Sequence, residues 1–276
     1  MLTELEINEL KQFACETRKN IVKMVHNAKS GHPGGSLSAA DIMAVLYNKS
    51  LNIPKEWNKS ADFENRDRFI LSKGHASPAL YATLANCGYF PKSLLSGFRI
   101  LGSKLQGHPS SRVGLAGIEV STGSLGQGLS IGVGIALALR LDKINSKVFV
   151  LMGDGEMQEG SVWEALMNAK AKELENLVVI VDKNNLQIDG AVQEVKSLEP
   201  LDEKLKAFGF NVTNIDGHNF DELEKTFKTA KESKKLEAII LNTIKGKGVS
   251  FMENNPSWHG KAPNDEQLQQ ALEELC

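Results

Sequence analysis

The sequence predicts an α/β fold in which a doubly wound, mostly parallel sheet is covered by helices on both faces. Short apolar runs rich in β-branched residues recur along the chain, at residues 69–71, 147–152, 177–182, 210–215 and 237–243. Segments with helical spacing of apolar residues lie between them. Continuous apolar strands that alternate with helices are typical of parallel sheets buried on both faces. We expect one domain over residues 1–276, because no repeat, low-complexity tract or linker interrupts the pattern.

The predicted helices precede and separate these strands. Residues 3–28 form an amphipathic pattern that should end at SGHPGG (30–35), since glycine and proline stop helices. The segment 122–141 begins with several glycines and continues with alternating apolar and small residues, which predicts a deeply buried helix. Further helices are expected at 39–48, 76–87, 160–172 and 265–275.

The composition indicates an ordinary globular protein, with 41% hydrophobic and 24% charged residues. A formal net charge of −2 provides no broad basic surface, so we expect no nucleic-acid partner. The sequence has neither the apolar run of about 18 residues that crosses a bilayer nor the apolar core of a signal peptide. Cys15, Cys87 and Cys276 form no C-x-x-C pair and read as ordinary thiols. A cytoplasmic location without membrane contact is therefore expected.

Two predicted strands run directly into polar residues. The strand at 147–152 continues as Gly153-Asp154-Gly155, and the strand at 177–182 is followed by Lys183 and Asn184. A lone Gly-Asp-Gly is also a good turn, but ligands of open parallel sheets bind at the carboxyl ends of strands, where two such ends can converge on one ion. Mg²⁺ prefers oxygen ligands and shares them with phosphates. The candidate metal ligands are the Asp154 carboxylate, the Asn184 amide oxygen and the backbone carbonyl of Leu186.

With these motifs the sequence resembles the thiamine-diphosphate enzymes, and among them transketolase. GDGEMQEGSVWEA (153–165) and NNLQIDG (184–190) match the transketolase form of the cofactor motif. Further matches follow in the order of the transketolase amino-terminal domain: SGHPGG (30–35), LSKGHASPALYA (71–82), LGSKLQGHP (101–109), STGSLGQG (121–128) and WHGKAP (258–263). The resemblance covers nearly the whole chain. It implies the diphosphate domain of the thiamine-diphosphate-binding fold, with thiamine diphosphate and Mg²⁺ as cofactors.

Four of the six histidines lie in these motifs, each beside a glycine. Taken singly, each could serve loop structure alone. The resemblance implies that His75 contacts the cofactor diphosphate and that His259 lies near both the diphosphate and the reacting carbon. It also implies that His32 and His108 reach the hydroxyl and carbonyl region of the ketose. The candidate catalytic residues are therefore His32, His108 and His259.

The resemblance implies further contacts to the cofactor. Gly123, Ser124 and Leu125 match a loop whose backbone approaches the aminopyrimidine, although transketolases commonly have proline where Ser124 stands. Glu159 matches a glutamate in the contact between paired subunits, so self-association is expected. The glycines could instead be turn residues, and Glu159 an acid favoured by the start of a helix. The remaining cofactor-binding candidates are Gly155, Asn184 and Ile188.

Three features stay outside this predicted site. His26 and His218 lie in no matched motif and are assigned to helix and turn structure. The segment KGKGV (245–249) lacks the G-x-x-x-x-G-K-[ST] pattern of a P-loop and is expected to be a loop near the diphosphate.

The resemblance implies transfer of a two-carbon ketol group between a ketose phosphate and an aldose phosphate. In transketolases the glutamate that activates the cofactor lies in a pyrimidine-binding domain, which has no counterpart in residues 1–276. The chain thus resembles the amino-terminal subunit of a split transketolase. We expect a separately encoded carboxyl-terminal subunit to supply the pyrimidine-binding domain, in a heterotetramer.

Two alternatives remain open at this stage. A deoxyxylulose-phosphate synthase would share the cofactor motif, but Gln158-Glu159-Gly160 favours transketolase. A non-catalytic thiamine-diphosphate-binding assembly subunit is the second alternative. The four motif histidines argue against it, because an assembly role does not need polar side chains directed at a sugar.

Overall fold

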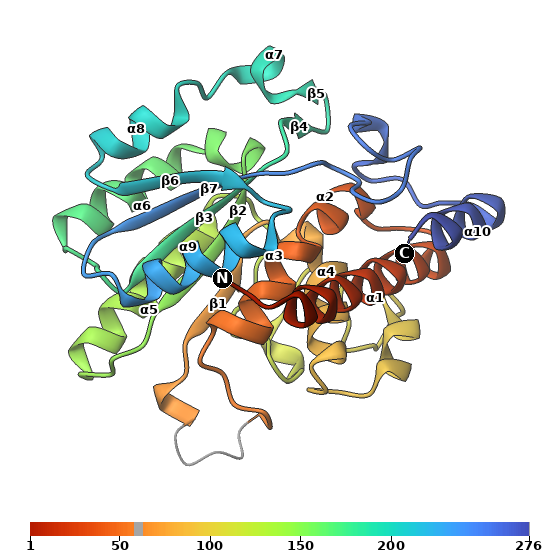
Figure 1. Ribbon diagram of the computed structural model, residues 1–276, viewed down its shortest axis with the longest axis horizontal. Helices are drawn as coiled ribbons and strands as arrows, with labels where there is room; N and C mark the ends of the chain where they lie inside the picture. The colour runs from red at the N-terminus through yellow and green to blue at the C-terminus, as the bar shows by residue number, and fades with distance from the viewer. Residues whose placement is uncertain (58–62, 276) are drawn as a thin grey trace.

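Five parallel strands form the central sheet of the computed structural model, which describes residues 1–57 and 63–275 (Figure 1). Their order across the sheet is β1-β2-β3-β7-β6. The strands span Arg68–Leu71 (β1), Val148–Gly153 (β2), Leu177–Lys183 (β3), Asn211–Asp216 (β6) and Glu237–Asn242 (β7). The predicted doubly wound α/β fold is therefore confirmed, and each strand overlaps an apolar run recognised in the sequence.

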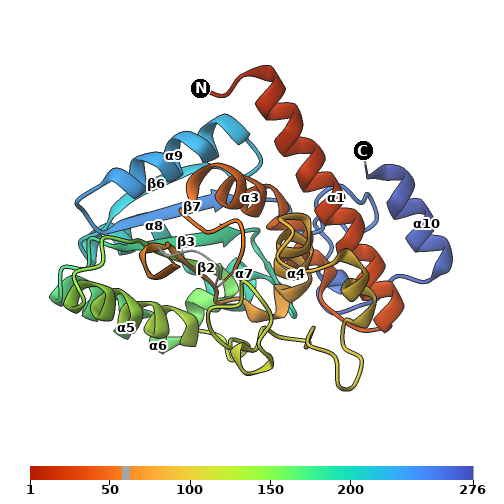
Figure 2. The ribbon, with the colours of Figure 1, turned by 90° about the horizontal axis from the view of Figure 1, so that it is seen from below.

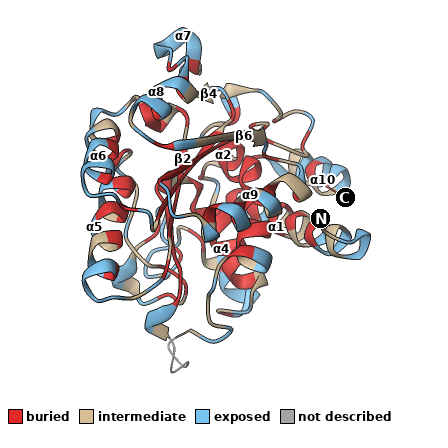
Figure 3. Cartoon of the chain, turned by 60° about the vertical axis from the view of Figure 1, so that its left-hand side comes forward, coloured by how far each residue is buried: buried red, intermediate tan, exposed pale blue. Residues whose placement is uncertain are grey.

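The sheet is buried because side chains from each strand enter two separate cores. Val150 of β2 and Val179 of β3 point into one core, whereas Leu151 and Ile180, the next residues, point into the other. This alternation follows from the two-residue period of a strand. In Figure 3 the strands are accordingly coloured as buried, except at the β6 edge.

Helices cover both faces of the sheet (Figure 2). One layer contains α5 (Gln127–Leu141), α6 (Gly160–Ala171) and α8 (Leu201–Ala207). The opposite layer contains α1 (Glu4–Ala28), α3 (Ala40–Val45), α4 (Ser77–Asn86) and α9 (Phe220–Glu232), and α10 (Asp265–Glu274) packs along α1. A short hairpin, β4 (Leu186–Gln187) and β5 (Gly190–Ala191), leads to α7 (Val192–Lys196) at the rim.

The first helix begins and ends as its sequence indicates. Thr3 and Glu6 form a reciprocal capping box at the start of α1, and Lys29 adopts the left-handed conformation at its end. The predicted end of the first helix is confirmed, since α1 ends at Ala28, but the sequence did not predict that Pro33 begins the short helix α2 (Pro33–Ser38). Proline fits the first turn of a helix, where its missing N–H is not needed. The predicted helix at 39–48 is α3, which continues as a π-helical turn over Leu46–Ser50.

The sequence predicted a deeply buried helix at 122–141, and this expectation is wrong for one face of the helix. The helix α5 begins only at Gln127, and Leu141 at its end is 80% exposed. Gly128 and Gly132 face inward, where a Cβ atom would lie 2.3 Å from Ser72 and 2.6 Å from Val150. The glycines therefore bring this helix close to the sheet, while its other face stays uncovered in this chain.

Two further expectations concern membranes and cysteines. None of the helices within 1–57 and 63–275 has the length and apolar character needed to span a lipid bilayer. Cys87 is a half-buried free thiol, whereas Cys276 lies outside the described residues.

Candidate active site

The carboxyl ends of β1, β2, β3 and β7 surround a cavity of about 350 Å³. The loops that follow these strands line it, together with residues of α2 and with His259, which follows the helical turn Pro256–Trp258. A cavity at this edge is the usual ligand site of an open parallel sheet. The lining residues are His32, Gly35, Lys73, His75, Gly123, Leu125, Gly153, Asp154, Gly155, Glu156, Gln158, Glu159, Asn184, Leu186, Gln187, Ile188, Asp189, Lys245 and His259.

Asp154 lies at the end of β2 and is 3% exposed. Its carboxylate accepts hydrogen bonds from the backbone N–H groups of Gly155, at 2.8 Å, and of Asn185. Burial and the nearby charge of Asp182 nevertheless raise the pKa of Asp154 to about 6. The surroundings therefore do not fully compensate the charge of this carboxylate.

Asn184 and Leu186 follow β3 at the same edge of the sheet. The Asn184 side-chain oxygen accepts from the Leu186 N–H at 3.2 Å, and the Leu186 carbonyl accepts from the Lys245 ammonium at 2.9 Å. The Leu186 carbonyl, which the sequence analysis proposed as a metal ligand, thus contacts the Lys245 ammonium. A carbonyl oxygen carries partial negative charge, so a cation is a favourable neighbour for it.

The four motif histidines come together although they lie far apart in the chain. The His32 ring centroid lies 5.3 Å from that of His75, 5.4 Å from that of His259 and 6.3 Å from that of His108, and His75 is 5.2 Å from His259. The sequence could place each histidine in a loop, but only the fold brings them side by side.

These histidines are neutral at physiological pH. Burial, followed by the positive charge of Arg99, lowers the pKa of His32 to about 4. Burial and the charge of Lys245 lower the pKa of His259 to about 3. Burial also lowers the pKa values of His75 and His108. A neutral imidazole has one donor and one acceptor nitrogen, so the cluster can exchange hydrogen bonds with hydroxyl and carbonyl groups.

Two lysines add positive charge to the cavity. Lys73, 1% exposed, forms a short ion pair with Asp182, which also accepts from Ser38 at 2.7 Å and from Thr243. Lys245, 2% exposed, has its pKa lowered to about 8 by burial and by the charge of Lys73. Lys73 is paired with a carboxylate, whereas the contacts of Lys245 are a carbonyl and an imidazole. Lys245 is therefore the cation better placed to bind an anion.

Glu156 is a buried carboxyl group that ties the cavity wall together. It accepts hydrogen bonds from Ser72, from the Gly126 N–H at 2.9 Å and from the Gly153 N–H at 3.2 Å. Burial raises its pKa despite these donors. Through these donors Glu156 connects the start of α5 to the end of β2.

All but two of the candidate residues from the sequence line this cavity. His108 is exposed and lies next to the lining: a Cβ atom on Gly123 would be 3.1 Å from the His108 ring, and that ring neighbours His32. Ser124 is exposed and outside the lining. Lys73, Glu156 and Lys245 also line the cavity; each lies in a segment quoted from the sequence, but none was named as a site residue. Lys73 follows β1 and Lys245 follows β7, so the rule that picked Asp154 and Asn184 from strand ends could have found both.

The cavity contains buried polar atoms without partners. His32 Nδ1 and Gln187 Oε1 are buried and unpaired within the described part of the chain, and buried groups of this kind mark positions where a ligand can bind. No group of three or more His, Cys, Asp or Glu side chains in residues 1–57 and 63–275 could hold a metal ion. A cation at Asp154 would therefore rely on amide, carbonyl and phosphate oxygens, a donor set that suits Mg²⁺.

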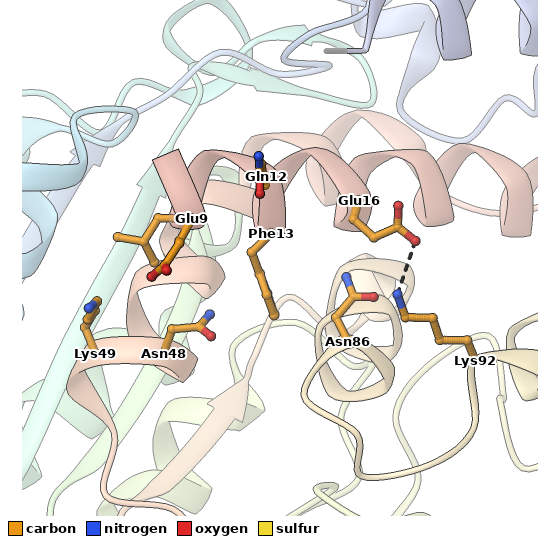
Figure 4. A pocket seen from close by; sticks show the side chains of 9 residues that line it. Glu9, Gln12, Phe13, Glu16, Asn48, Lys49, Asn86 and Lys92 are labelled. Atoms are coloured by element: carbon orange, nitrogen blue, oxygen red, sulfur yellow. Dashed lines mark hydrogen bonds and ion pairs between the residues drawn. The ribbon is translucent and has the colours of Figure 1, made fainter. Parts of the chain in front are cut away.

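A second hollow, along α1, has a different character (Figure 4). Glu16 pairs with Lys92 at 3.3 Å across it, and Lys49 at its rim pairs with Glu6 at 2.8 Å. The side chains in these two ion pairs are partly exposed, and in each pair the positive and negative charges neutralise each other. The α1 hollow lacks the buried, unpaired groups of the strand-end cavity, so we assign no chemistry to it.

Known proteins match this chain over nearly its whole length. Residues 10–276 match the family described as transketolase, thiamine diphosphate binding domain. The chain is 41% identical to one subunit of the apulose-4-phosphate transketolase of Phocaeicola vulgatus, covering 98% of this chain and 95% of that protein. It is 42% identical to the 6-deoxy-6-sulfo-D-fructose transketolase subunit SqwG of a Clostridium species, covering 97% of this chain and 96% of that protein.

Solved structures of longer transketolases match as well. The Campylobacter jejuni enzyme is 35% identical with a TM-score of 0.87, over 97% of this chain and 43% of that chain. The Pichia stipitis enzyme in complex with sedoheptulose-7-phosphate is 32% identical with a TM-score of 0.87, over 95% of this chain and 40% of that one. The chain spans less than half the length of these transketolases. It belongs to the transketolase family, as the amino-terminal, thiamine-diphosphate-binding subunit of the split type.

Proposed function

We propose that this subunit binds thiamine diphosphate and Mg²⁺ in the strand-end cavity and transfers a two-carbon ketol group from a ketose phosphate to an aldose phosphate. The observation that carries the proposal is the convergence of four neutral histidines with Asp154, Asn184 and Lys245 around one cavity. When bound, the cofactor supplies the electron sink for breaking and making the carbon–carbon bond. The protein's contribution is binding, orientation and hydrogen bonding.

The polar residues divide this work by position. Asp154, Asn184 and the Leu186 carbonyl would hold the metal, and Lys245 with His75 would bind the diphosphate. Lys245 would exchange its Leu186 contact for the more strongly charged phosphate oxygens. His32, His108 and His259, being neutral, would donate and accept hydrogen bonds around the sugar and position it for reaction.

The partner is a separately encoded transketolase subunit that carries a pyrimidine-binding domain. Relatives named as subunits support this assignment, and we propose a heterotetramer of two such pairs, with self-association through the region of Glu159. The named relatives differ in their ketose, apulose-4-phosphate in one and 6-deoxy-6-sulfo-D-fructose in the other, at nearly equal identity to this chain. We therefore propose that the partner contributes to the choice of sugar phosphate. The cytoplasmic location stays a prediction from the sequence.

Reconstitution tests this function. The purified chain is mixed with thiamine diphosphate, Mg²⁺ and a ketose and an aldose phosphate, with and without the pyrimidine-binding subunit. We expect ketol transfer only when both subunits are present. Turnover by this chain alone would contradict the need for a partner, and no transfer by the complex with any ketose phosphate would contradict the proposed reaction.

One substitution distinguishes the proposed catalytic subunit from the alternative, a non-catalytic subunit that only assembles the site. His259→Ala removes a neutral imidazole that faces the cavity without removing the cofactor-binding edge of β2 and β3. We expect turnover of the reconstituted complex to fall by about 100-fold, in the range for loss of a positioned acid–base group. Unchanged turnover would favour a subunit that only assembles the site.

A further inference from the structure

His218 connects the rear of the cavity wall to a buried carboxylate. It lies in the turn between β6 and α9, outside the cavity lining. Its Nε2 atom accepts a hydrogen bond from the Ile244 N–H at 2.9 Å, and its Nδ1 atom lies 2.7 Å from the Asp41 carboxylate. Because a backbone N–H can only donate, the ring proton is on Nδ1 and is donated to Asp41. His218 is thus a neutral imidazole held in one tautomer.

Asp41 is a fixed acceptor for this imidazole. It lies on α3, is 4% exposed, and accepts from the Arg18 guanidinium of α1 at 2.6 Å. Burial alone would raise the pKa of Asp41, but the Arg18 charge and the hydrogen bond from His218 outweigh it and hold the pKa below its usual value. The carboxylate therefore stays ionised and orients the ring from behind.

The peptide that His218 holds immediately precedes the cationic residue of the cavity. Ile244 is followed by Lys245, whose ammonium contacts the Leu186 carbonyl and His259. The turn is also held at Gly246, whose N–H donates to the Gly34 carbonyl at 3.0 Å. Packing behind it is tight, since a Cβ atom on Gly217 would lie 2.5 Å from Thr243.

The residues of this turn have different partners. The Thr243 hydroxyl donates to Asp182 and the Lys245 ammonium to the carbonyl of Leu186, a cavity-lining residue, whereas the Ile244 N–H donates to His218, which lies outside the lining. Without His218 the Ile244 N–H would lose its acceptor, and the peptide could rotate to find another. Rotation of that peptide would move the backbone from which the Lys245 side chain extends.

We propose that His218, oriented by Asp41, is a positioning residue that sets the place of the Lys245 ammonium in the cofactor site; the inference rests on the proposed function of that cavity. His218 is not among the residues that line the cavity. Its effect passes through the Ile244 peptide alone.

Two substitutions separate the two hydrogen bonds of the ring. In His218→Asn, the side-chain amide occupies the place of Nδ1 and can donate to Asp41, but Ile244 has no acceptor. In His218→Gln, the side-chain carbonyl reaches the place of Nε2 and can accept from Ile244. His26→Asn is the matched control, because His26 also pairs with a carboxylate, Asp265 at 2.8 Å, but lies on α1 away from the cavity.

The measurements are made on the full chain in complex with its partner subunit. Calorimetry gives the Kd for thiamine diphosphate with Mg²⁺, hydrogen exchange reports the peptide containing Ile244, and urea unfolding reports stability. We expect His218→Asn to weaken cofactor binding about tenfold and to speed exchange at Ile244, as for loss of one buried hydrogen bond. His218→Gln should stay within about threefold of the unsubstituted protein, and His26→Asn should not change the Kd.

The outcomes distinguish the inference from the function on which it rests. If His218→Asn lowers stability but leaves the Kd unchanged, His218 is merely structural and the inference is overturned. Equal weakening by the Asn and Gln variants would overturn the role of the Ile244 acceptor. If the unsubstituted complex does not bind thiamine diphosphate at all, the proposed function itself fails and the inference fails with it.

Discussion

The Lys245 ammonium lies 2.9 Å from Nδ1 of His259 and donates to it, since an ammonium has no acceptor. The single proton of the neutral His259 ring is therefore on Nε2. The same ammonium contacts the Leu186 carbonyl at 2.9 Å. Lys245 thus sets the tautomer of His259, a candidate catalytic residue, and contacts Leu186, a candidate metal ligand. Through Lys245, the binding of metal and diphosphate is therefore coupled to the protonation of the candidate catalytic histidine.

Replacing Lys245 with glutamine tests this coupling. The positive charge of Lys245 is the second cause, after burial, of the low pKa of His259, which is about 3. Without the charge we expect the pKa of His259 to rise by about one unit, while burial still holds it below 6.5. Affinity for the cofactor diphosphate should fall about tenfold or more, since a charge-assisted hydrogen bond is lost. NMR titration of the His259 ring and calorimetry measure the two effects.

Lys247→Gln is the control for this substitution. Lys247 lies in the same loop but is partly exposed, pairs with Glu253 at 3.7 Å and does not line the cavity. It should change neither the pKa of His259 nor the affinity. An unaltered His259 titration in Lys245→Gln would contradict the coupling.

The histidine cluster predicts how stability depends on pH. Each folded-state pKa is depressed, so below about pH 6.5 the unfolded chain binds protons that the folded chain does not. Stability is therefore full above 6.5 and falls as the pH decreases toward 4, the pKa of His32, and 3, the pKa of His259. We expect the free energy of unfolding to fall by roughly 1–3 kcal/mol across this window, because solvent screening of these partly exposed rings limits the effect.

Urea unfolding of the chain between about pH 7 and pH 5 measures this dependence. The double substitution His32→Asn and His259→Asn should make the curve shallower, because asparagine does not titrate. His26→Asn serves as the control outside the cavity and should leave the slope as it is. Equal slopes for the double variant and the unsubstituted chain would contradict the assignment of His32 and His259 as neutral in the folded chain.

Asp154→Asn separates the cost of a buried charge from its use in binding a metal. The folded-state pKa of Asp154, about 6, lies above the usual value, so its contribution to stability is present at low pH and is lost as the pH rises through 6. At about pH 7.5 without metal, we expect the asparagine variant to be more stable by about 1–2 kcal/mol. With Mg²⁺ and inorganic diphosphate the order should reverse, because only the carboxylate gains from binding the cation.

Urea unfolding with Mg²⁺ and diphosphate, and again after addition of EDTA, measures both states. The unsubstituted chain should lose its added stability in EDTA and Asp154→Asn should not respond. The affinity for Mg²⁺ should fall at least about 100-fold in the variant, since the carboxylate is the only charged protein ligand proposed. A variant that is stabilised by Mg²⁺ as much as the unsubstituted chain would rule out Asp154 as a ligand.

The sequence was sufficient to predict the strands of the sheet and the edge of the sheet at which the cavity lies. The strand Leu177–Lys183 is buried at all positions but its last, so it appears in the sequence as a continuous apolar run. Asp154 and Asn184 follow such runs directly, which is why both could be placed at one edge. The same information did not reveal that α5 is exposed along one face, because its small and apolar residues look alike whether or not another surface covers them.

The missed residues depend on contacts between distant segments. Lys73 is buried because Asp182, 109 residues later, pairs with it, and no local pattern indicates that pairing. His218 lies in no motif, so its sequence context indicates only turn structure, but the fold places its ring against the Ile244 N–H. Ser124 belongs to a matched loop, yet the fold leaves it exposed. Strand ends can be recognised locally, whereas side-chain partners across the cavity require the folded chain.

Arg99 joins the two loops that carry His32 and His108. Its guanidinium donates to the Ser30 hydroxyl at 3.2 Å and packs so closely on Gly107 that a Cβ atom there would lie 2.9 Å from it. After burial, its charge is the next cause of the lowered pKa values of His32 and His108. We therefore expect Arg99→Gln to raise both histidine pKa values by about half a unit to one unit, and to raise KM for the ketose phosphate severalfold as the loops loosen.

Arg99→Lys distinguishes the charge from the bridge between the loops. Lysine keeps the positive charge but lacks the planar fork that spans Ser30 and Gly107. The histidine pKa values, measured by NMR, should then stay low while KM still rises. If lysine and glutamine raise the pKa values equally, the charge of Arg99 does not act on these rings. If neither variant changes KM, the position of the two loops does not depend on Arg99, and His32 and His108 must be held by their own segments.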